Sequence, residues 1–168
     1  MAEKQTAESG IVAEITYYMK TKRKTVFLTG GTGNMGWAGF QELYKRKDRF
    51  NIRLLARDSR KNHKMLDKYA SDPAVTVIWG DLTRYEGVLE GVNGSDYVLH
   101  VGGMVSPAAD YFPEKTLKVN VAAAENVVKA VLAQPHKDDI KVVYIGSVAQ
   151  YGDRNPPHHW GDVNAPQT

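Results

Sequence analysis

Four of the seven residues 30–36 are glycines, and they stand where the sequence changes from a strand pattern to a helix pattern. Apolar residues 26–28 precede this segment, and a helix-like stretch, 37–45, follows it. A nearly bare backbone lets a phosphate approach closely, and the free N–H groups and positive end of the following helix stabilise its charge. This is the context in which a glycine-rich turn binds a dinucleotide pyrophosphate, although a tight turn also uses glycine without a ligand. The candidate phosphate-binding residues are Gly30, Gly31, Thr32, Gly33, Asn34, Met35 and Gly36.

Charged residues follow the second apolar run, 52–56, where dinucleotide-binding folds meet the adenosine ribose. An acidic residue at this place hydrogen-bonds the ribose hydroxyls and favours NAD, whereas an arginine accommodates the 2′-phosphate of NADP. Arg57 stands first, with Arg60 and Lys61 close behind, and this trio suits a phosphate dianion. NADP is therefore the favoured cofactor. NAD is the alternative, because Asp58 is an acid only one residue further on, and solvated loop charges without a ligand are a third interpretation.

Asp81 and Leu82 follow the third apolar run, 75–79. In a nucleotide site, Asp81 would accept a hydrogen bond from the adenine amino group, and Leu82 would pack on the ring. The aspartate is equally well explained as a helix N-cap or turn residue, which is a common use of this side chain.

Short apolar runs alternate with helical segments from residue 25 onward. Such runs are typical of parallel strands buried on both faces, and their alternation with helices indicates a doubly wound sheet. We expect a Rossmann-type α/β fold of about five parallel strands, ordered 3-2-1-4-5, with helices on both faces and any ligand at one edge of the sheet. The predicted strands are 26–28, 52–56, 75–79, 97–101 and 142–145, and the predicted helices are 34–46, 61–70, 84–91 and 115–133.

The last predicted helix, 115–133, has the clearest periodicity. Its apolar residues recur on one side, as in a helix that packs an apolar stripe against a core. The residues of this stripe are Leu117, Val121, Ala124, Val128, Val131 and Leu132.

The composition is that of an ordinary soluble domain. The chain has 168 residues, of which 42% are hydrophobic and 24% charged. A net charge of +3 is too mild to indicate nucleic-acid binding, and the basic run 20–24 is interpreted as a solvated lead-in to the first strand. The absence of cysteine excludes disulfides, thiolate zinc sites and a cysteine nucleophile. With no apolar stretch near the roughly 18 residues that span a bilayer and no signal-peptide core, we expect a cytoplasmic protein.

Five short motifs occur in order between residues 25 and 155. They are the glycine string, Gly80-Asp81-Leu82, the segment 100–107, the Asn120-Val121 pair at a helix opening, and the segment 144–152. Together they resemble the extended short-chain dehydrogenase/reductase family, the group that contains nucleotide-sugar epimerases, dehydratases and dihydroflavonol-type reductases. Each motif is modest alone, and their common register makes the resemblance specific.

The resemblance implies roles in binding the nucleotide half of the cofactor. Gly30, Gly33 and Gly36 match the pyrophosphate turn of the family. Asp81 and Leu82 match its adenine pocket.

The resemblance also implies roles at the reacting end. Val101, Gly102 and Gly103 match the loop beside the nicotinamide, where the family usually has alanines. Asn120 matches a helix asparagine near the active site. Ser147 matches the catalytic serine, which hydrogen-bonds the reacting hydroxyl or carbonyl oxygen.

The general acid of the family is the main departure. It is a tyrosine four residues before a lysine that lowers its pKa, and this pair should follow Ser147 by roughly two dozen residues or more. The sequence reaches Thr168 without it. Tyr18 and Lys22 have the right spacing but precede the glycine string, and Tyr111 and Lys115 are expected in a loop before the last helix.

The resemblance therefore implies the NAD(P)-binding half of an oxidoreductase or of a nucleotide-sugar epimerase or dehydratase, inactive alone. Its substrate would be a small carbonyl compound, an alcohol or a nucleotide sugar. The alternatives are a non-catalytic NADP(H)-binding sensor or interaction module, or a truncated gene product. A homo-oligomer or a complementing subunit is a further expectation, because the missing strands would leave an exposed sheet edge.

Three regions are expected along the chain. Residues 1–24 form an extension with a short helix over 11–20, residues 25–155 form the dinucleotide-binding domain, and residues 156–168 form a tail that begins a missing substrate lobe. His158 and His159 have no evident third ligand, so we expect no metal site.

Overall fold

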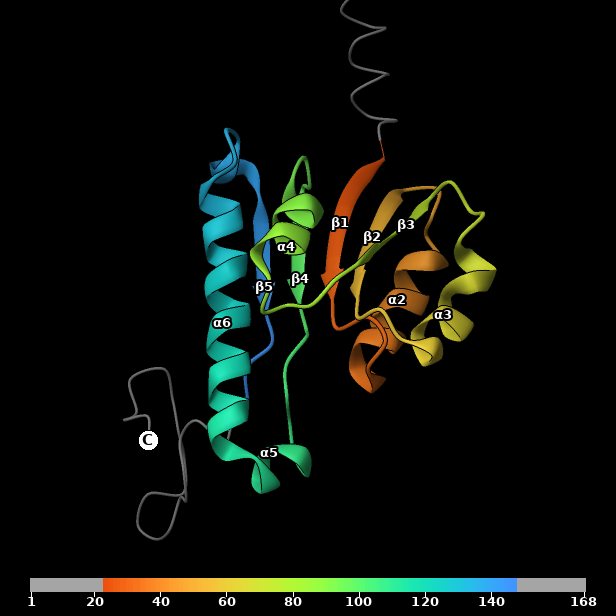
Figure 1. The fold of residues 1–168 in the computed structure, drawn as a ribbon. Helices are drawn as coiled ribbons and strands as arrows, with labels where there is room; N and C mark the ends of the chain where they lie inside the picture. Colours follow the sequence, from red (N-terminus) through yellow and green to blue (C-terminus); the bar gives the residue numbers. More distant parts are fainter. Residues whose placement is uncertain (1–22, 148–168) are drawn as a thin grey trace, which may run out of the picture.

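The computed structural model describes residues 23–147, which contain one five-stranded parallel sheet. The order of the strands is β3-β2-β1-β4-β5, as predicted, and every neighbouring pair is parallel (Figure 1). The Rossmann-type fold class is therefore confirmed. The strands are β1 (Lys24–Thr29), β2 (Phe50–Ala56), β3 (Val75–Trp79), β4 (Tyr97–His100) and β5 (Lys141–Tyr144).

Helices cover both faces of this sheet. α4 and α6 lie on one face, and α2 and α3 lie on the other (Figure 1). The chain passes from β1 outward to β3, and then returns to β4 on the far side of β1, which is why the helices change faces. The helices are α2 (Asn34–Tyr44), α3 (Arg60–Leu66), α4 (Tyr85–Val92), α5 (Ala108–Tyr111) and α6 (Pro113–Leu132), with 3₁₀ turns η1 (Asp67–Tyr69) and η2 (Lys137–Asp139).

Two apolar cores follow from the alternation of side chains along the central strands. In β1, Phe27 faces α4 and α6, whereas Leu28 faces α2 and α3. In β2, Leu55 lies in the core with Phe27, and Leu54 lies in the core with Leu28. Because successive strand residues point to opposite faces, a continuous apolar run is required where both faces are covered. This explains why the runs located the strands to within one or two residues.

Most of the apolar stripe predicted for the last helix does not face the core, and the prediction is wrong for those residues, although Val131 does pack against the core. Leu117 is 67% exposed and Leu132 61% exposed. The buried residues of α6 are instead Ala123, Val127 and Ala130, at spacings of four and three, and α6 packs there against α4. Two alanines let the helices approach closely, so the smaller residues form the contact and the larger ones remain outside.

The segment between Tyr111 and Lys115 is also not the predicted loop. α5 ends at Tyr111, and Pro113 opens α6, since a proline at the first helical position loses no helical hydrogen bond. The predicted helix over 11–20, the tail 156–168 and the pair His158 and His159 lie outside the described residues. Within residues 23–147, no helix is long and apolar enough to cross a membrane.

Candidate functional site

The carboxyl ends of the strands meet at the edge of the sheet that lies toward α5 in Figure 1. β1 and β4 are neighbours there, and Thr29 at the end of β1 pairs with His100 at the end of β4. The chain leaves these two strands toward helices on opposite faces. Open parallel sheets bind ligands at such a switch point, so the loops that follow Thr29 and His100 frame the candidate site.

The glycine turn joins β1 to α2 in a tight, hydrogen-bonded conformation. Gly30 has φ 70°, a value that favours glycine, and its carbonyl accepts the N–H of Gly33 at 2.9 Å. Gly33 is the N-cap of α2 in extended conformation. No side chain caps the helix, and its first turn carries no acidic residue. The positive end of α2 is thus left open to an anion.

Three glycines of the turn have different steric surroundings. A β-carbon at Gly30 would lie 2.6 Å from Gly102 Cα, and one at Gly36 would overlap the carbonyl of Gly30. At exposed Gly33, by contrast, the nearest atom to a β-carbon would be the Gly30 carbonyl oxygen at 3.4 Å. The first and third glycines therefore permit the tight turn and the helix packing, and the second leaves the outer face of the backbone clear.

The remaining candidates of the string differ in exposure. Thr32 is half-buried, while Asn34 and Met35 are exposed at the opening of α2. Gly31 is buried, and a β-carbon there would overlap the Leu54 side chain. Gly31 therefore packs against the core, and the exposed face of the string consists of residues 33–35.

A buried hydrogen-bond chain connects the loops after β1 and β4. Thr29 Oγ1 lies 2.8 Å from His100 Nδ1 and accepts the N–H of Gly102 at 3.1 Å. The hydroxyl has one proton and two lone pairs, so beside the bond from Gly102 it can either donate to His100 Nδ1 or accept from it. Burial lowers the pKa of His100, which favours the neutral imidazole. Neither Thr29 nor His100 was among the predicted site residues.

Two asparagines of α6 hold the loops at this edge. Asn120 Oδ1 accepts the N–H of Met104 at 2.7 Å, and Asn120 Nδ2 donates to the Met104 carbonyl at 3.0 Å. Asn126 Nδ2 donates to the carbonyl of Leu82 at 2.8 Å. The predicted residue Asn120 is thus a clamp on the loop after β4, and Asn126, which sequence reasoning missed, clamps the loop after β3.

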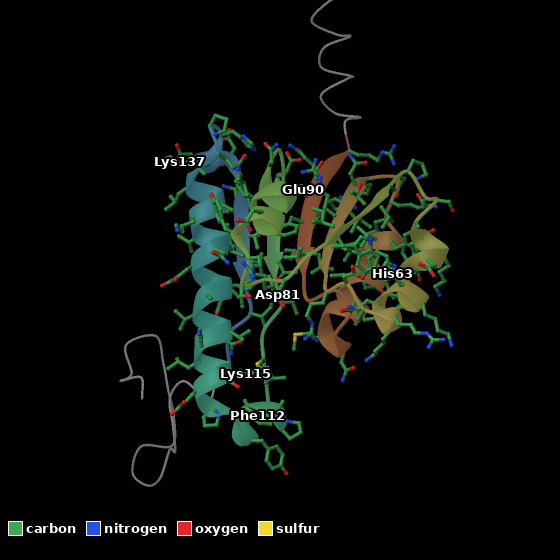
Figure 2. The ribbon with its side chains drawn as sticks, in the orientation of Figure 1. His63, Asp81, Glu90, Phe112, Lys115 and Lys137 are labelled. Carbon is green, nitrogen blue, oxygen red and sulfur yellow. The ribbon has the colours of Figure 1, made fainter. Side chains whose placement is uncertain are left out.

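Asp81 lies near the carboxyl ends of the strands (Figure 2). Its Oδ1 accepts the N–H of Thr83 at 2.8 Å and the Thr83 hydroxyl at 2.7 Å, which is the turn role that the sequence left open. The Thr83 N–H bond holds the pKa of Asp81 below its ordinary value, and the charges of Arg57 and Arg84 add to the effect. Leu82 packs against the loop after β4 at Gly102.

The basic loop after β2 is fixed by α3. Asn62 Nδ2 donates to the Arg57 carbonyl at 2.7 Å, and Ser59 caps α3 by accepting the N–H of Asn62 at 3.2 Å. Arg57 is exposed, and among residues 23–147 its guanidinium makes no hydrogen bond or ion pair. Asp58, by contrast, is bonded to His63, with 2.9 Å between Oδ1 and Nε2.

The other candidates lie at the β4–β5 side of the same edge. Val101 packs on the α2 side of the core, and a β-carbon at Gly103 would lie 3.1 Å from Asn120 Oδ1. Ser147 is exposed and follows the end of β5 by three residues. Ile145 N–H still bonds to the His100 carbonyl at 3.2 Å, so the two chain segments leave the sheet together. Among residues 23–147, no group of three potential ligands is arranged to hold a metal ion.

Comparison with known sequences gives one family. Residues 26–166 match the family described as the NAD dependent epimerase/dehydratase family. The UDP-glucose 4-epimerase of Rickettsia massiliae is 32% identical over 113 residues, which are 65% of this chain and 33% of that protein. The UDP-glucose 4-epimerase of Rickettsia akari is 33% identical over 113 residues, with the same coverage. The chain thus spans about a third of the length of the curated relatives that it matches.

Solved structures give the same fold. Pen from Bacillus thuringiensis has a TM-score of 0.66 and 27% identity over 80% of this chain and 40% of its own. The UDP-Glc/GlcNAc 4-epimerase from Campylobacter jejuni has a TM-score of 0.69 at 18% identity, over 86% of this chain and 43% of its own. UDP-glucose 4-epimerase from Bifidobacterium longum, solved in complex with NAD+ and UDP, has a TM-score of 0.65 at 18% identity, over the same shares.

These findings agree with the switch point between β1 and β4 and with the glycine turn at the start of α2. Because the family match extends over most of the sequence, the chain belongs to the NAD-dependent epimerase/dehydratase family.

Proposed function

We propose that this chain is the dinucleotide-binding half of an NAD(P)-dependent enzyme of the epimerase/dehydratase type. The observation that carries the proposal is the uncapped start of α2 behind Gly33, at the edge where the loops after β1 and β4 touch. The pyrophosphate would lie against residues 30–36, with Thr32, Asn34 and Met35 beside it. Bound dinucleotide would supply a nicotinamide that accepts or returns hydride. Family membership and the NAD+ complex of the Bifidobacterium longum epimerase support this assignment.

The adenosine would lie across the ends of β2 and β3. Arg57 is our candidate for the 2′-phosphate of NADP, since its guanidinium is exposed and unpaired within the described residues. Asp81 uses Oδ1 for Thr83, and we assign its other oxygen to the adenine amino group. Leu82 would pack on the ring while Asn126 holds its carbonyl. NADP is therefore our first choice of cofactor, with NAD as the alternative.

The substrate class that we propose is a nucleotide sugar, as the names of the curated relatives suggest. Val101, Gly102 and Gly103 would border the nicotinamide, and Ser147 would hydrogen-bond the reacting oxygen. Asn120 would act through the Met104 backbone as a positioning residue. No Tyr-x-x-x-Lys pair follows Ser147 as far as Thr168, so the acid/base pair would come from outside these residues. We therefore expect binding without turnover from the 168-residue chain.

The test is a fluorescence titration of the purified chain with NADPH and with NADH. We expect saturable binding of both, with NADPH the tighter, and no steady reduction or epimerisation of UDP-sugars. Absence of binding by either dinucleotide would overturn the proposal. Steady turnover would contradict the proposal that the acid/base pair lies outside these residues, but it would not contradict the binding role.

A second proposed property of the chain is that it forms a homo-oligomer. The observation that favours it is the outer stripe of α6, which consists of Leu117, Val121, Val128 and Leu132. These residues are 45–67% exposed. Their order, Leu-Val-Val-Leu with spacings of four, seven and four, is the same in both directions along the helix. Two copies of α6 paired antiparallel about a two-fold axis would thus place leucine on leucine and valine on valine, which suits a self-complementary interface. We propose a second copy as its occupant.

A further inference from the structure

The two residues that compete for the adenosine ribose, Arg57 and Asp58, are adjacent in sequence but have different surroundings. The Arg57 guanidinium contributes to lowering the pKa of Asp81, so its charge acts on the loop after β3. The Asp58 carboxylate is bonded to His63 of α3 instead. The loop that carries both is fixed at its backbone by Asn62 and Ser59.

His63 is itself held in place by a second contact. Its ring stacks on the indole of Trp79, with 3.9 Å between the centroids and an angle of 25° between the planes. Trp79 is the last residue of β3 and pairs in register with Ala56, the last residue of β2. Figure 2 shows His63 on α3, on the side of the sheet away from α6. The imidazole therefore presents Nε2 to Asp58 from a ring plane that β3 fixes.

We propose that His63 sets the cofactor preference of this site by holding the Asp58 carboxylate against α3. The inference rests on the proposed dinucleotide site. An unrestrained Asp58 carboxylate at the end of β2 would accept hydrogen bonds from the ribose hydroxyls of NAD and would repel the 2′-phosphate of NADP. When His63 holds the Asp58 carboxylate, the Arg57 guanidinium is the group that faces the 2′ position of the adenosine ribose.

The expected effect is modest because the pair is partly in solvent. The His63 side chain is 44% exposed and the Asp58 side chain 78% exposed. Exposed polar pairs contribute little, and release of this one corresponds to about a two- to five-fold change in the ratio of the dissociation constants for NAD and NADP.

The test compares dissociation constants for NADH and NADPH in the full chain and in three variants. His63→Phe keeps an aromatic ring for Trp79 but removes the nitrogen that contacts Asp58. Asp58→Asn removes the carboxylate charge, and the double variant combines both changes. Lys64→Ala is the matched control, because Lys64 is the exposed neighbour of His63 on α3 and has no side-chain hydrogen bond or ion pair within the described residues.

We expect His63→Phe to lower the preference for NADPH about three-fold, mainly through weaker NADPH binding. The double variant should regain the preference of Asp58→Asn alone, because no carboxylate is left to release. Lys64→Ala should match the parent chain. An unchanged ratio in His63→Phe, or an equal weakening of both dinucleotides, would overturn the inference while leaving the binding site intact. If the parent chain bound neither dinucleotide, the proposed function itself would fail, and the inference with it.

Discussion

Gly102 lies in close contact with the loop after β1. A β-carbon there would overlap the end of the Leu82 side chain and would lie 3.1 Å from the backbone nitrogen of Gly30. The alanine usual in the resembled family would therefore require Leu82 to move and the two loops to separate slightly, whereas glycine allows their close contact. Thr29 supports the same contact, since its hydroxyl joins Gly102 to His100. At this scale, the loops after β1 and β4 are joined through the buried pair of Thr29 and His100, and burial favours the neutral imidazole.

The first prediction concerns the pH dependence of stability. The folded state lowers the pKa of His100 below 6.5, so the unfolded chain binds a proton first as the pH falls. The contribution of His100 to the free energy of unfolding is therefore complete above about pH 6.5. It is lost as the pH falls through the folded-state pKa of His100. Urea unfolding between pH 7.5 and 5 should show a declining free energy. His100→Gln should show a shallower decline, and equal slopes in both proteins would contradict the role given to the neutral imidazole.

At the scale of the elements, α6 connects the two sides of the candidate site. Asn120 and Asn126 hold the loops after β4 and β3, while Ala123, Val127 and Ala130 pack the same helix on the core. The sequence predicted this helix well because its apolar periodicity is long. It did not predict which face is buried, because two apolar stripes coexist and only the packing partner decides between them.

The same limit explains the residues that sequence reasoning missed. The strands were predictable because residues such as Phe27 and Leu28 must be apolar on both faces. Asn126 contacts the Leu82 carbonyl across 44 residues, and Thr29 meets His100 across 71. No local spacing encodes such pairs, since they arise only when parallel strands bring distant loops to one edge.

The second prediction tests the clamp on the loop after β3. Asn126→Ala leaves the Leu82 carbonyl without its donor, at a cost of about 1–2 kcal/mol in unfolding free energy. Because this loop borders the proposed adenine site, NADPH affinity should also fall, about three- to ten-fold. Titration and thermal unfolding on the same samples measure both effects.

The matched control is Gln134→Ala, since Gln134 also donates one hydrogen bond to a carbonyl, that of Ala130, at the far end of α6. We expect it to lose stability while keeping its affinity for NADPH. An equal loss of affinity in both variants would show that Asn126 acts only through the stability of the fold.

At the scale of the whole molecule, the described residues leave apolar surface on the β5 side. Val143 and Ile145 are 45% and 42% exposed, and the four residues of the outer stripe of α6 are 45–67% exposed. Soluble proteins expose single apolar residues commonly, but contiguous apolar surface marks contacts with another protein or another segment. The palindromic order of the α6 stripe favours a second copy of the chain.

The third prediction is that the purified chain is a dimer and that Val121→Glu combined with Val128→Glu makes it a monomer. Two carboxylates per helix would be buried against their symmetry mates, at a cost of several kcal/mol. Light scattering after size exclusion measures the mass. Val105→Glu, a similar exchange at a 73% exposed residue outside α6, should remain dimeric. A monomeric parent chain would contradict the pairing.

NADPH binding by the variant Gly33→Asp shows directly whether the start of α2 is the anion site. Gly33 is the exposed, extended N-cap of α2, and no atom lies closer than 3.4 Å to a β-carbon placed there. Aspartate is a favoured N-cap, so the variant should fold with unchanged or slightly higher stability. Its carboxylate would take the place of the pyrophosphate at the helix start, and the control Gly39→Asp carries the same charge where a β-carbon has open space.

We predict that Gly33→Asp weakens NADPH binding by more than about 100-fold, because like charges placed together cost several kcal/mol, while Gly39→Asp binds as the parent chain does. Thermal unfolding of each variant shows that the fold is intact. A folded Gly33→Asp protein that binds NADPH as tightly as the parent chain would contradict an anion cradle at the start of α2.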